Sequence, residues 1–376
     1  MHWGSMLAFG LDSGRLMVVD EATGEEKWAV QAHALTSSVH VAMPQSGRIV
    51  ASVGFQDDAC KIWDAGSGEL QRVLAMHEGT GAHIGAFRQV AFSPCGQRLA
   101  TPGSDGAVIL WDARTGEAEH RMQGVAGHSR GMTSITFSAD GARVASVTGE
   151  VVTRDESIDV FDTTTGAWLR TIGGEGRLTG VSFSPIANSI LASVTMDDAI
   201  HMWDIDSGEM IREIEGCNFA IFSPDGRTIA TASPGHDVED RGDMQLMDAE
   251  SGQMRLRIVG HSDVVWTASW SADGSKLATV SVDDTCKVWD STTGALLRTI
   301  ENGHATGRFS SMAWGRDWVN PTPHTLHPKP YTLHPTPYTV NPQPSTRNLK
   351  LGAGHATGGG VRDGAPPAAR GGVAGA

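Results

Sequence analysis

The chain has 376 residues, of which 40% are hydrophobic and 19% charged, and its formal net charge is −14. This composition supports a hydrophobic core, and the acidic excess argues against general nucleic-acid binding. No apolar run reaches about 18 residues, the start lacks a basic segment followed by an apolar one, and only four cysteines occur. These features exclude a membrane protein, a secreted disulfide scaffold and a collagen-like chain, so we expect an intracellular protein, cytoplasmic or nuclear.

Short strands and tight turns alternate along residues 1–320. A strand over 7–10 comes first, and later units begin with strands such as 88–92 and 132–137. Turns rich in Asp and Gly follow, as at 223–226, because these residues favour tight reversals. No segment keeps a helical periodicity, which predicts an all-β chain.

One pattern recurs seven times at intervals of 42 to 50 residues: an apolar residue, an Asp, three further residues and a Gly. Self-similarity at this period is the signature of a repeat architecture with one four-stranded unit per copy. The copies begin at Val19-Asp20, Trp63-Asp64, Trp111-Asp112, Phe161-Asp162, Trp203-Asp204, Met247-Asp248 and Trp289-Asp290.

The two ends of the repeat region are complementary. The chain starts with the second strand of a four-stranded unit and has no first strand of that unit before it. The strand over 309–314 is the first strand of a unit, but no Trp-Asp pair follows it. We expect 309–314 to pair with the N-terminal strands and to close a ring of seven units; the alternative is that both ends are truncated.

These repeats resemble the WD-repeat family of β-propellers over residues 1–320. The resemblance implies a seven-bladed β-propeller of four-stranded blades. It also implies a stabilising network in each blade, in which an Asp accepts from a His, the His bonds a Ser or Thr, and the hydroxyl meets the Trp indole. Three blades carry the full set: His33, Ser52, Asp57 and Trp63; His83, Thr101, Asp105 and Trp111; and His261, Thr279, Asp283 and Trp289.

Four blades depart from the family pattern. The fourth has Phe161 in place of Trp, and the fifth has Gly174 in place of His. The sixth has Met247 and the first has Val19 where the Trp belongs. We expect packing, rather than the network, to hold these blades together.

The resemblance also indicates a binding face. In the family, the His loop and the Asp turn lie on one side of the ring, called the top, and in this chain the extra residues fall in those loops, at 76–82, 149–154 and 234–242. Loops that lengthen on one face suggest a binding surface; the alternative is an ordinary varied surface. The predicted partner-binding residues are Arg88, Trp266, Arg154, Asn218, Met196 and Gln56.

A second motif is Trp111-Asp112-Ala113-Arg114, which matches the W-D-x-R pattern of WD-repeat substrate receptors of cullin-type ubiquitin ligases. By this resemblance Arg114 would contact the ligase adaptor, but the turn Asp-Ala-Arg-Thr-Gly at 112–116 is also a common solvated turn of the repeat. Ser, His and Asp co-occur as in a hydrolase triad, yet a constellation repeated around a ring indicates structure rather than catalysis. We therefore expect no enzyme, no cofactor and no metal site.

The composition changes after residue 320. Thr325, Thr332 and Thr339 each begin a proline-rich heptad, and the last 25 residues are mostly Gly and Ala. We predict a disordered tail over 321–376, either a proline-rich ligand or translated repetitive DNA. The overall prediction is a non-catalytic protein-interaction scaffold or adaptor, monomeric or a subunit of a larger complex. The less favoured alternatives are the ligase receptor and a propeller enzyme.

Overall fold

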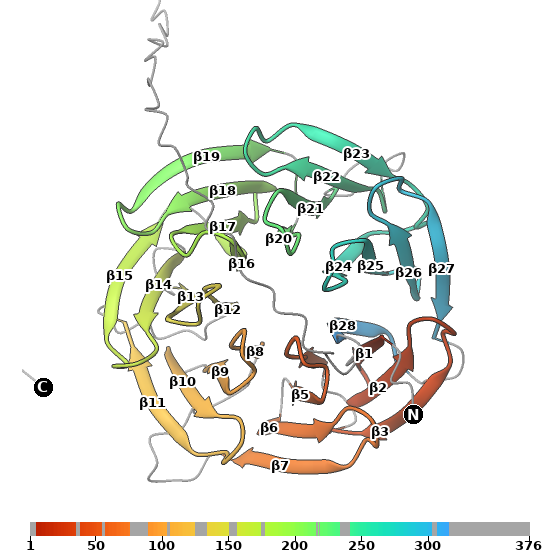
Figure 1. Cartoon of the computed structure of the whole chain (residues 1–376), viewed down its shortest axis with the longest axis horizontal. Coiled ribbons are helices and arrows are strands. Elements are labelled where there is room, and N and C mark those ends of the chain that lie inside the picture. The colour runs from red at the N-terminus through yellow and green to blue at the C-terminus, as the bar shows by residue number, and fades with distance from the viewer. Residues whose placement is uncertain are drawn as a thin grey trace, which may run out of the picture. The chain divides into compact units, whose positions relative to one another are not determined.

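The computed structural model describes residues 5–34, 38–54, 57–75, 89–103, 106–124, 134–149, 156–173, 177–215, 217, 219–233, 241–302 and 307–315. Within these ranges the chain forms seven four-stranded antiparallel sheets and no helix. The sheets follow one another around a ring as the blades of a propeller (Figure 1). The predicted all-β, seven-bladed fold is therefore confirmed.

Each blade runs from a first strand at the centre of the ring to a fourth strand at its rim (Figure 1). Blade 1 consists of β28 (Phe309–Gly315), β1 (Met6–Leu11), β2 (Arg15–Asp20) and β3 (Glu26–Gln31). Blade 2 consists of β4 (Val39–Ala42), β5 (Ile49–Gly54), β6 (Asp57–Asp64) and β7 (Leu70–Ala75). Blade 3 consists of β8 (Ala91–Phe92), β9 (Arg98–Pro102), β10 (Ala107–Asp112) and β11 (Ala118–Gln123).

The remaining four blades repeat this order along the chain. Blade 4 consists of β12 (Ile135–Phe137), β13 (Arg143–Gly149), β14 (Glu156–Asp162) and β15 (Trp168–Gly173). Blade 5 consists of β16 (Leu178–Phe183), β17 (Ile190–Thr195), β18 (Ala199–Asp204) and β19 (Glu209–Glu215). Blade 6 consists of β20 (Ile221–Phe222), β21 (Thr228–Ala232), β22 (Met244–Asp248) and β23 (Met254–Ile258). Blade 7 consists of β24 (Val265–Trp270), β25 (Lys276–Ser281), β26 (Thr285–Asp290) and β27 (Leu296–Glu301).

Blade 1 combines the two ends of the propeller. β28 pairs antiparallel with β1, from Met6 opposite Gly315 to Gly10 opposite Ser311. Hydrogen bonds extend the joint at both ends, from Trp314 Nε1 to Ser5 Oγ at 2.6 Å and from the Asp12 backbone N–H to the Arg308 carbonyl at 3.0 Å. A strand from residues 309–315 thus completes a sheet that the N-terminal strands begin.

The core lies between neighbouring blades. In one cluster, Leu7 and Phe9 of blade 1 pack against Val280, Val288 and Ile300 of blade 7, all fully or almost fully buried. Second and third strands have apolar residues on both faces because each face meets another blade, whereas fourth strands such as β11 are mostly exposed. Burial of apolar area between sheets therefore holds the ring together.

The repeated Asp and Gly form the turn between the third and fourth strands. In blade 7, Asp290 Oδ1 accepts hydrogen bonds from the backbone N–H groups of Thr292 at 3.0 Å and Thr293 at 2.7 Å. Gly294 closes the turn with φ of 72°, which glycine adopts without strain. The backbone hydrogen bond from Thr293 is the main cause that lowers the pKa of Asp290. The spacing of Asp and Gly in the repeat is thus the spacing of one turn.

The chain divides into two units, Met1–Pro321 and Thr322–Ala376. The tail expected over 321–376 lies outside the described residues. Among the residues that are described, no helix is long and apolar enough to span a bilayer.

Candidate functional site

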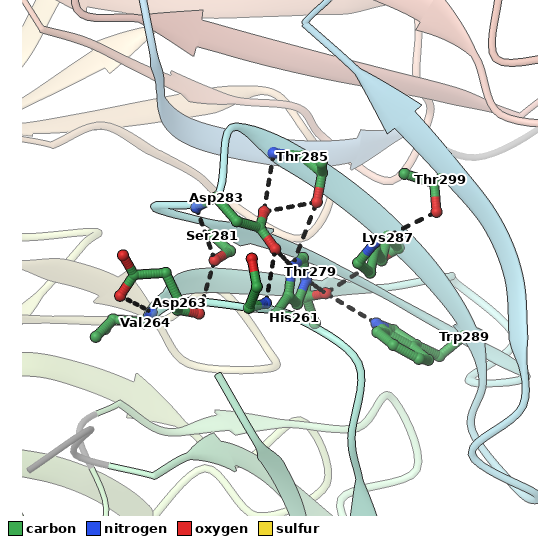
Figure 2. A network of polar contacts seen from close by, with 11 residues as sticks. His261, Asp263, Val264, Thr279, Ser281, Asp283, Thr285, Lys287, Trp289 and Thr299 are labelled. Carbon is green, nitrogen blue, oxygen red and sulfur yellow. Dashed lines mark hydrogen bonds and ion pairs between the residues drawn. The ribbon is translucent and has the colours of Figure 1, made fainter. Parts of the chain in front are cut away.

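Blade 7 contains a buried polar network of four residues (Figure 2). His261 precedes β24, Thr279 lies on β25, Asp283 lies in the turn after β25, and Trp289 lies on β26. His261 Nδ1 is 2.8 Å from Asp283 Oδ2, and His261 Nε2 is 2.7 Å from Thr279 Oγ1. Trp289 Nε1 donates to the same Thr279 oxygen at 2.8 Å. The structure thus brings together His261, Thr279, Asp283 and Trp289.

The direction of these hydrogen bonds follows from the donors present. Burial is the main cause that holds the pKa of His261 below its usual value, and it outweighs the hydrogen bond and charge of Asp283. A neutral imidazole with its proton on Nδ1 donates to the Asp283 carboxylate and accepts the Thr279 hydroxyl proton on Nε2. Because an indole N–H can only donate, Trp289 occupies the remaining acceptor position on Thr279. Every polar group in the chain from Trp289 to Asp283 is then satisfied.

Asp283 also fixes the two loops that meet on this side of the blade. It accepts the Ser262 backbone N–H at 3.0 Å and, on its other oxygen, the Thr285 hydroxyl at 2.6 Å. The connection from β23 to β24 is thereby tied to the turn from β25 to β26. We call the side of the ring where such connections meet the top face.

Other blades contain shorter versions of the network. Ser52 Oγ lies 2.9 Å from His33 Nε2 and accepts from Trp63 Nε1 at 2.8 Å. In blade 3 Trp111 donates to Thr101 Oγ1, and in blade 5, which lacks the His, Trp203 donates to Ser193 Oγ. The Asp57 side chain, His83 and Asp105 lie outside the described residues.

The blades without a Trp are packed in different ways. Phe161 in blade 4 is fully buried, and Ser146 Oγ donates to the Ser134 carbonyl at 3.1 Å. In blade 6, buried Asp243 forms an ion pair with Arg257, whose Nε donates to Asp243 Oδ2 at 2.6 Å. Sequence reasoning missed this pair, because Asp243 precedes β22, Arg257 lies on β23, and neither residue has a counterpart in the family pattern.

The buried hydroxyls cannot serve as nucleophiles. Ser52, Thr101, Ser193 and Thr279 are each 0% exposed, so no substrate reaches their oxygens. A catalytic triad needs an accessible nucleophile. Among the described residues there is also no group of three or more His, Cys, Asp or Glu side chains that could hold a metal ion.

The top face opens into a cavity on the ring axis. Its volume is about 500 Å³, and residues from or next to the first strand of every blade line it. Trp266 at the start of β24 is part of this lining and is 60% exposed. Met196, in the turn after β17, is 52% exposed, and its backbone N–H donates to the Arg177 carbonyl at 2.8 Å.

Two of the six predicted partner-binding residues, Trp266 and Met196, thus have exposed side chains in the loops or strand starts of the top face. Arg88, Arg154, Asn218 and Gln56 lie outside the described residues. Arg114 lies in the turn after β10, at the opposite end of the strands, and is exposed. Its backbone N–H donates to Asp112 Oδ1 at 2.8 Å, as the turn requires, and its contact with a ligase adaptor stays a prediction.

The buried His261 predicts a pH-dependent stability. In the folded protein its pKa lies below the usual value of 6.5, so the unfolded chain binds more protons as the pH falls. The contribution of neutral His261 to the free energy of unfolding is fully present above the pKa that this residue has in the unfolded chain. It is lost as the pH falls below that value. Urea unfolding should therefore show a lower free energy of unfolding at about pH 5.5 than at about pH 7.5.

The matched control is His261→Asn, which cannot titrate. Its free energy of unfolding should change less over the same pH interval. An equal pH dependence in the two proteins would contradict the neutral, proton-donating role of His261.

Comparison with known proteins agrees with this structure. Residues 68–112 and 252–290 match the family model described as "WD domain, G-beta repeat". The chain is 25% identical to Autophagy-related protein 16 of Arabidopsis thaliana over 64% of the chain and 45% of that protein. It is 28% identical to Nuclear distribution protein PAC1 of Coccidioides posadasii, over 61% and 53% respectively.

A third similar protein is WD repeat-containing protein 1 of Xenopus tropicalis, 26% identical over 75% of this chain and 46% of that protein. The chain therefore spans about half the length of these relatives. The matched segments, the seven-bladed ring and the Trp–hydroxyl–His–Asp networks thus show a seven-bladed β-propeller that contains WD repeats.

Proposed function

We propose that the protein is a non-catalytic interaction scaffold that binds partner proteins on the top face of its propeller. The observation that carries the proposal is the exposed indole of Trp266 beside the axial cavity. Tryptophan is enriched among the residues that dominate binding energy at protein interfaces. Here it lies near the start of strand β24 and lines the axial cavity.

The lining of the cavity is suited to a peptide rather than to a small apolar ligand. Hydroxyl groups of Ser134, Thr136, Thr179 and Ser310 lie around it, and His40 adds an imidazole. Such groups offer both donors and acceptors to a peptide backbone. Single exposed apolar residues are ordinary on protein surfaces, but Trp266 lies at the edge of the axial cavity, where a partner can contact both.

The relatives support an interaction role without naming a partner. Their names refer to autophagy, nuclear distribution and, in another similar protein of Arabidopsis thaliana, transcriptional corepression. Proteins with such different names share the repeat, as expected when a fold supplies a surface on which different sites evolve. The partners of this chain are proteins or peptides in our proposal, with Arg88, Arg154, Asn218 and Gln56 as further contacts.

Quantitative capture from cell lysate tests the top face. We expect Trp266→Ala to lose a captured protein that the unchanged chain retains, because truncation of a central interface residue typically costs about 2 kcal/mol or more. Met254→Ala is the control, since Met254 is 55% exposed but lies on the outer strand β23. If the captured proteins were the same for all three baits, the top-face proposal would fail at Trp266.

A further inference from the structure

Neighbouring blades share a contact at the rim of the ring. A side chain in the middle of the fourth strand reaches the turn that follows the third strand of the next blade. In four such contacts a side-chain N–H donates to a turn carbonyl over 2.7–3.0 Å. The donors and acceptors are Trp28 and Ala65, His120 and Thr164, Arg212 and Ser251, and Arg298 and Thr23.

At two further junctions an arginine of the fourth strand lies against the turn of the next blade. Among the described residues, neither arginine donates a hydrogen bond to a carbonyl of that turn. A Cβ placed on Gly116 would lie 3.6 Å from Arg72 Cδ, and one placed on Gly208 would meet the guanidinium of Arg170. Within the described residues, a long polar or aromatic side chain therefore covers the turn at six of the junctions between blades. We call this contact the rim clasp.

The junction between blades 6 and 7 is different, because Leu256 on β23 takes the place of the clasp residue. A Cβ on Gly294 would lie 3.3 Å from Leu256 Cδ2, which puts this side chain over the turn of blade 7 as at the other junctions. Leucine has no donor. Over the part of the chain that the structure describes, no hydrogen bond reaches the carbonyl oxygens of Thr292 and Thr293 in that turn.

A cavity of about 330 Å³ opens at this junction. Leu256, Ser291 and Thr292 form its outer end, and Trp270 lies along it, held by an Nε1 hydrogen bond to the Ile221 carbonyl at 3.3 Å. Its inner end carries the exposed carboxylates of Asp225 and Asp273. We call it the blade 6–7 groove.

The charges in the groove favour a cation. Asp225 accepts the Ser223 hydroxyl at 2.6 Å, and Asp273 accepts the Ser271 hydroxyl at 2.7 Å, so each carboxylate is held in place by its own turn. Arg255 is the one cationic side chain among the described lining residues, and it donates to Thr228 Oγ1 at 3.1 Å. The two carboxylates leave the groove with a net negative charge.

We infer that the blade 6–7 groove binds an arginine side chain of a partner protein, beside Leu256 and next to the turn whose counterparts the chain's own arginines cover at neighbouring junctions. A guanidinium can donate to the Thr292 carbonyl at the outer end of the groove or to a carboxylate at its inner end, and it stacks on aromatic faces such as that of Trp270. The inference does not depend on the top face, because the groove lies at the other end of the strands.

Titration with N-acetyl-argininamide tests the inference, with the Trp270 indole N–H signal in the NMR spectrum as the readout. That signal is assigned as the one missing from Trp270→Phe. We expect it to shift and saturate at millimolar ligand, and N-acetyl-norleucinamide to bind at least about tenfold more weakly because it lacks the cation. Asp225→Asn combined with Asp273→Asn should weaken binding about threefold or more while keeping the turn hydrogen bonds.

The decisive variant is Leu256→Arg, which supplies the missing clasp within the chain. We expect it to keep or raise the midpoint of urea unfolding and to abolish the titration. Met254→Arg is its control, since it adds the same charge to the same strand outside the groove and should bind like the unchanged protein. No shift in the unchanged protein, equal binding of norleucinamide, or undiminished binding by folded Leu256→Arg would each overturn the inference.

Discussion

Replacing Trp289 by alanine is expected to lower the free energy of unfolding by about 3–5 kcal/mol. Trp289 is 2% exposed and packs with Leu277, Val265 and Ile258 of blades 6 and 7, so its removal leaves a large cavity between the blades. It also removes the indole donor to Thr279. The measurement is urea unfolding followed by circular dichroism.

The control is Trp266→Ala, which removes the same side chain from a position that is 60% exposed. This variant should stay within about 0.5 kcal/mol of the unchanged protein. If both variants unfolded at the same urea concentration as the unchanged protein, Trp289 would not be the buried centre of a blade.

Loss of strand β28 should lower the free energy of unfolding by as much as the Trp289→Ala substitution, or by more. A chain that ends at residue 306 lacks Phe309 and Met312, which are 3% and 7% exposed and belong to the core between blades 7 and 1. Phe309 lies 4.7 Å from Phe9, centroid to centroid. Removing both side chains should cost more than about 5 kcal/mol, a large part of the stability of a typical protein.

A chain that ends at residue 316 is the matched control, because it keeps β28 and lacks only residues 317–376. We expect this chain to unfold at the temperature of the full protein, and the shorter one to lose its cooperative transition and expose the edge of β1 to aggregation. Equal melting temperatures for the two truncated chains would show that β28 does not close the ring.

The repeat could be predicted from the sequence because each copy encodes one local turn and one local pair of strands. The spacing from Asp290 to Gly294 is the length of a turn closed by side-chain and backbone hydrogen bonds. The equivalent places of Cys60 and Cys286 in the repeat predict packing residues on separate blades. Both are fully buried, and burial raises the pKa of both thiols.

Contacts between blades could not be predicted in this way. The Asp243–Arg257 pair and the place of Leu256 over the turn of blade 7 depend on how neighbouring strands and blades align in space. Two first strands are shorter than predicted within the described residues, because positions 89, 90 and 134 lie outside β8 and β12. The remaining positions of these two predictions, 88 and 132–133, lie outside the described residues.

The central proposal is that partners bind the top face, and amide hydrogen exchange tests it most directly. Exchange is measured by mass spectrometry on the protein alone and with the partner lost from Trp266→Ala. We predict protection in peptides that cover Met196 and Trp266, and none in the outer strands β19, β23 and β27. Protection confined to the outer strands, or to the turns that hold Asp204, Asp248 and Asp290, would contradict the account.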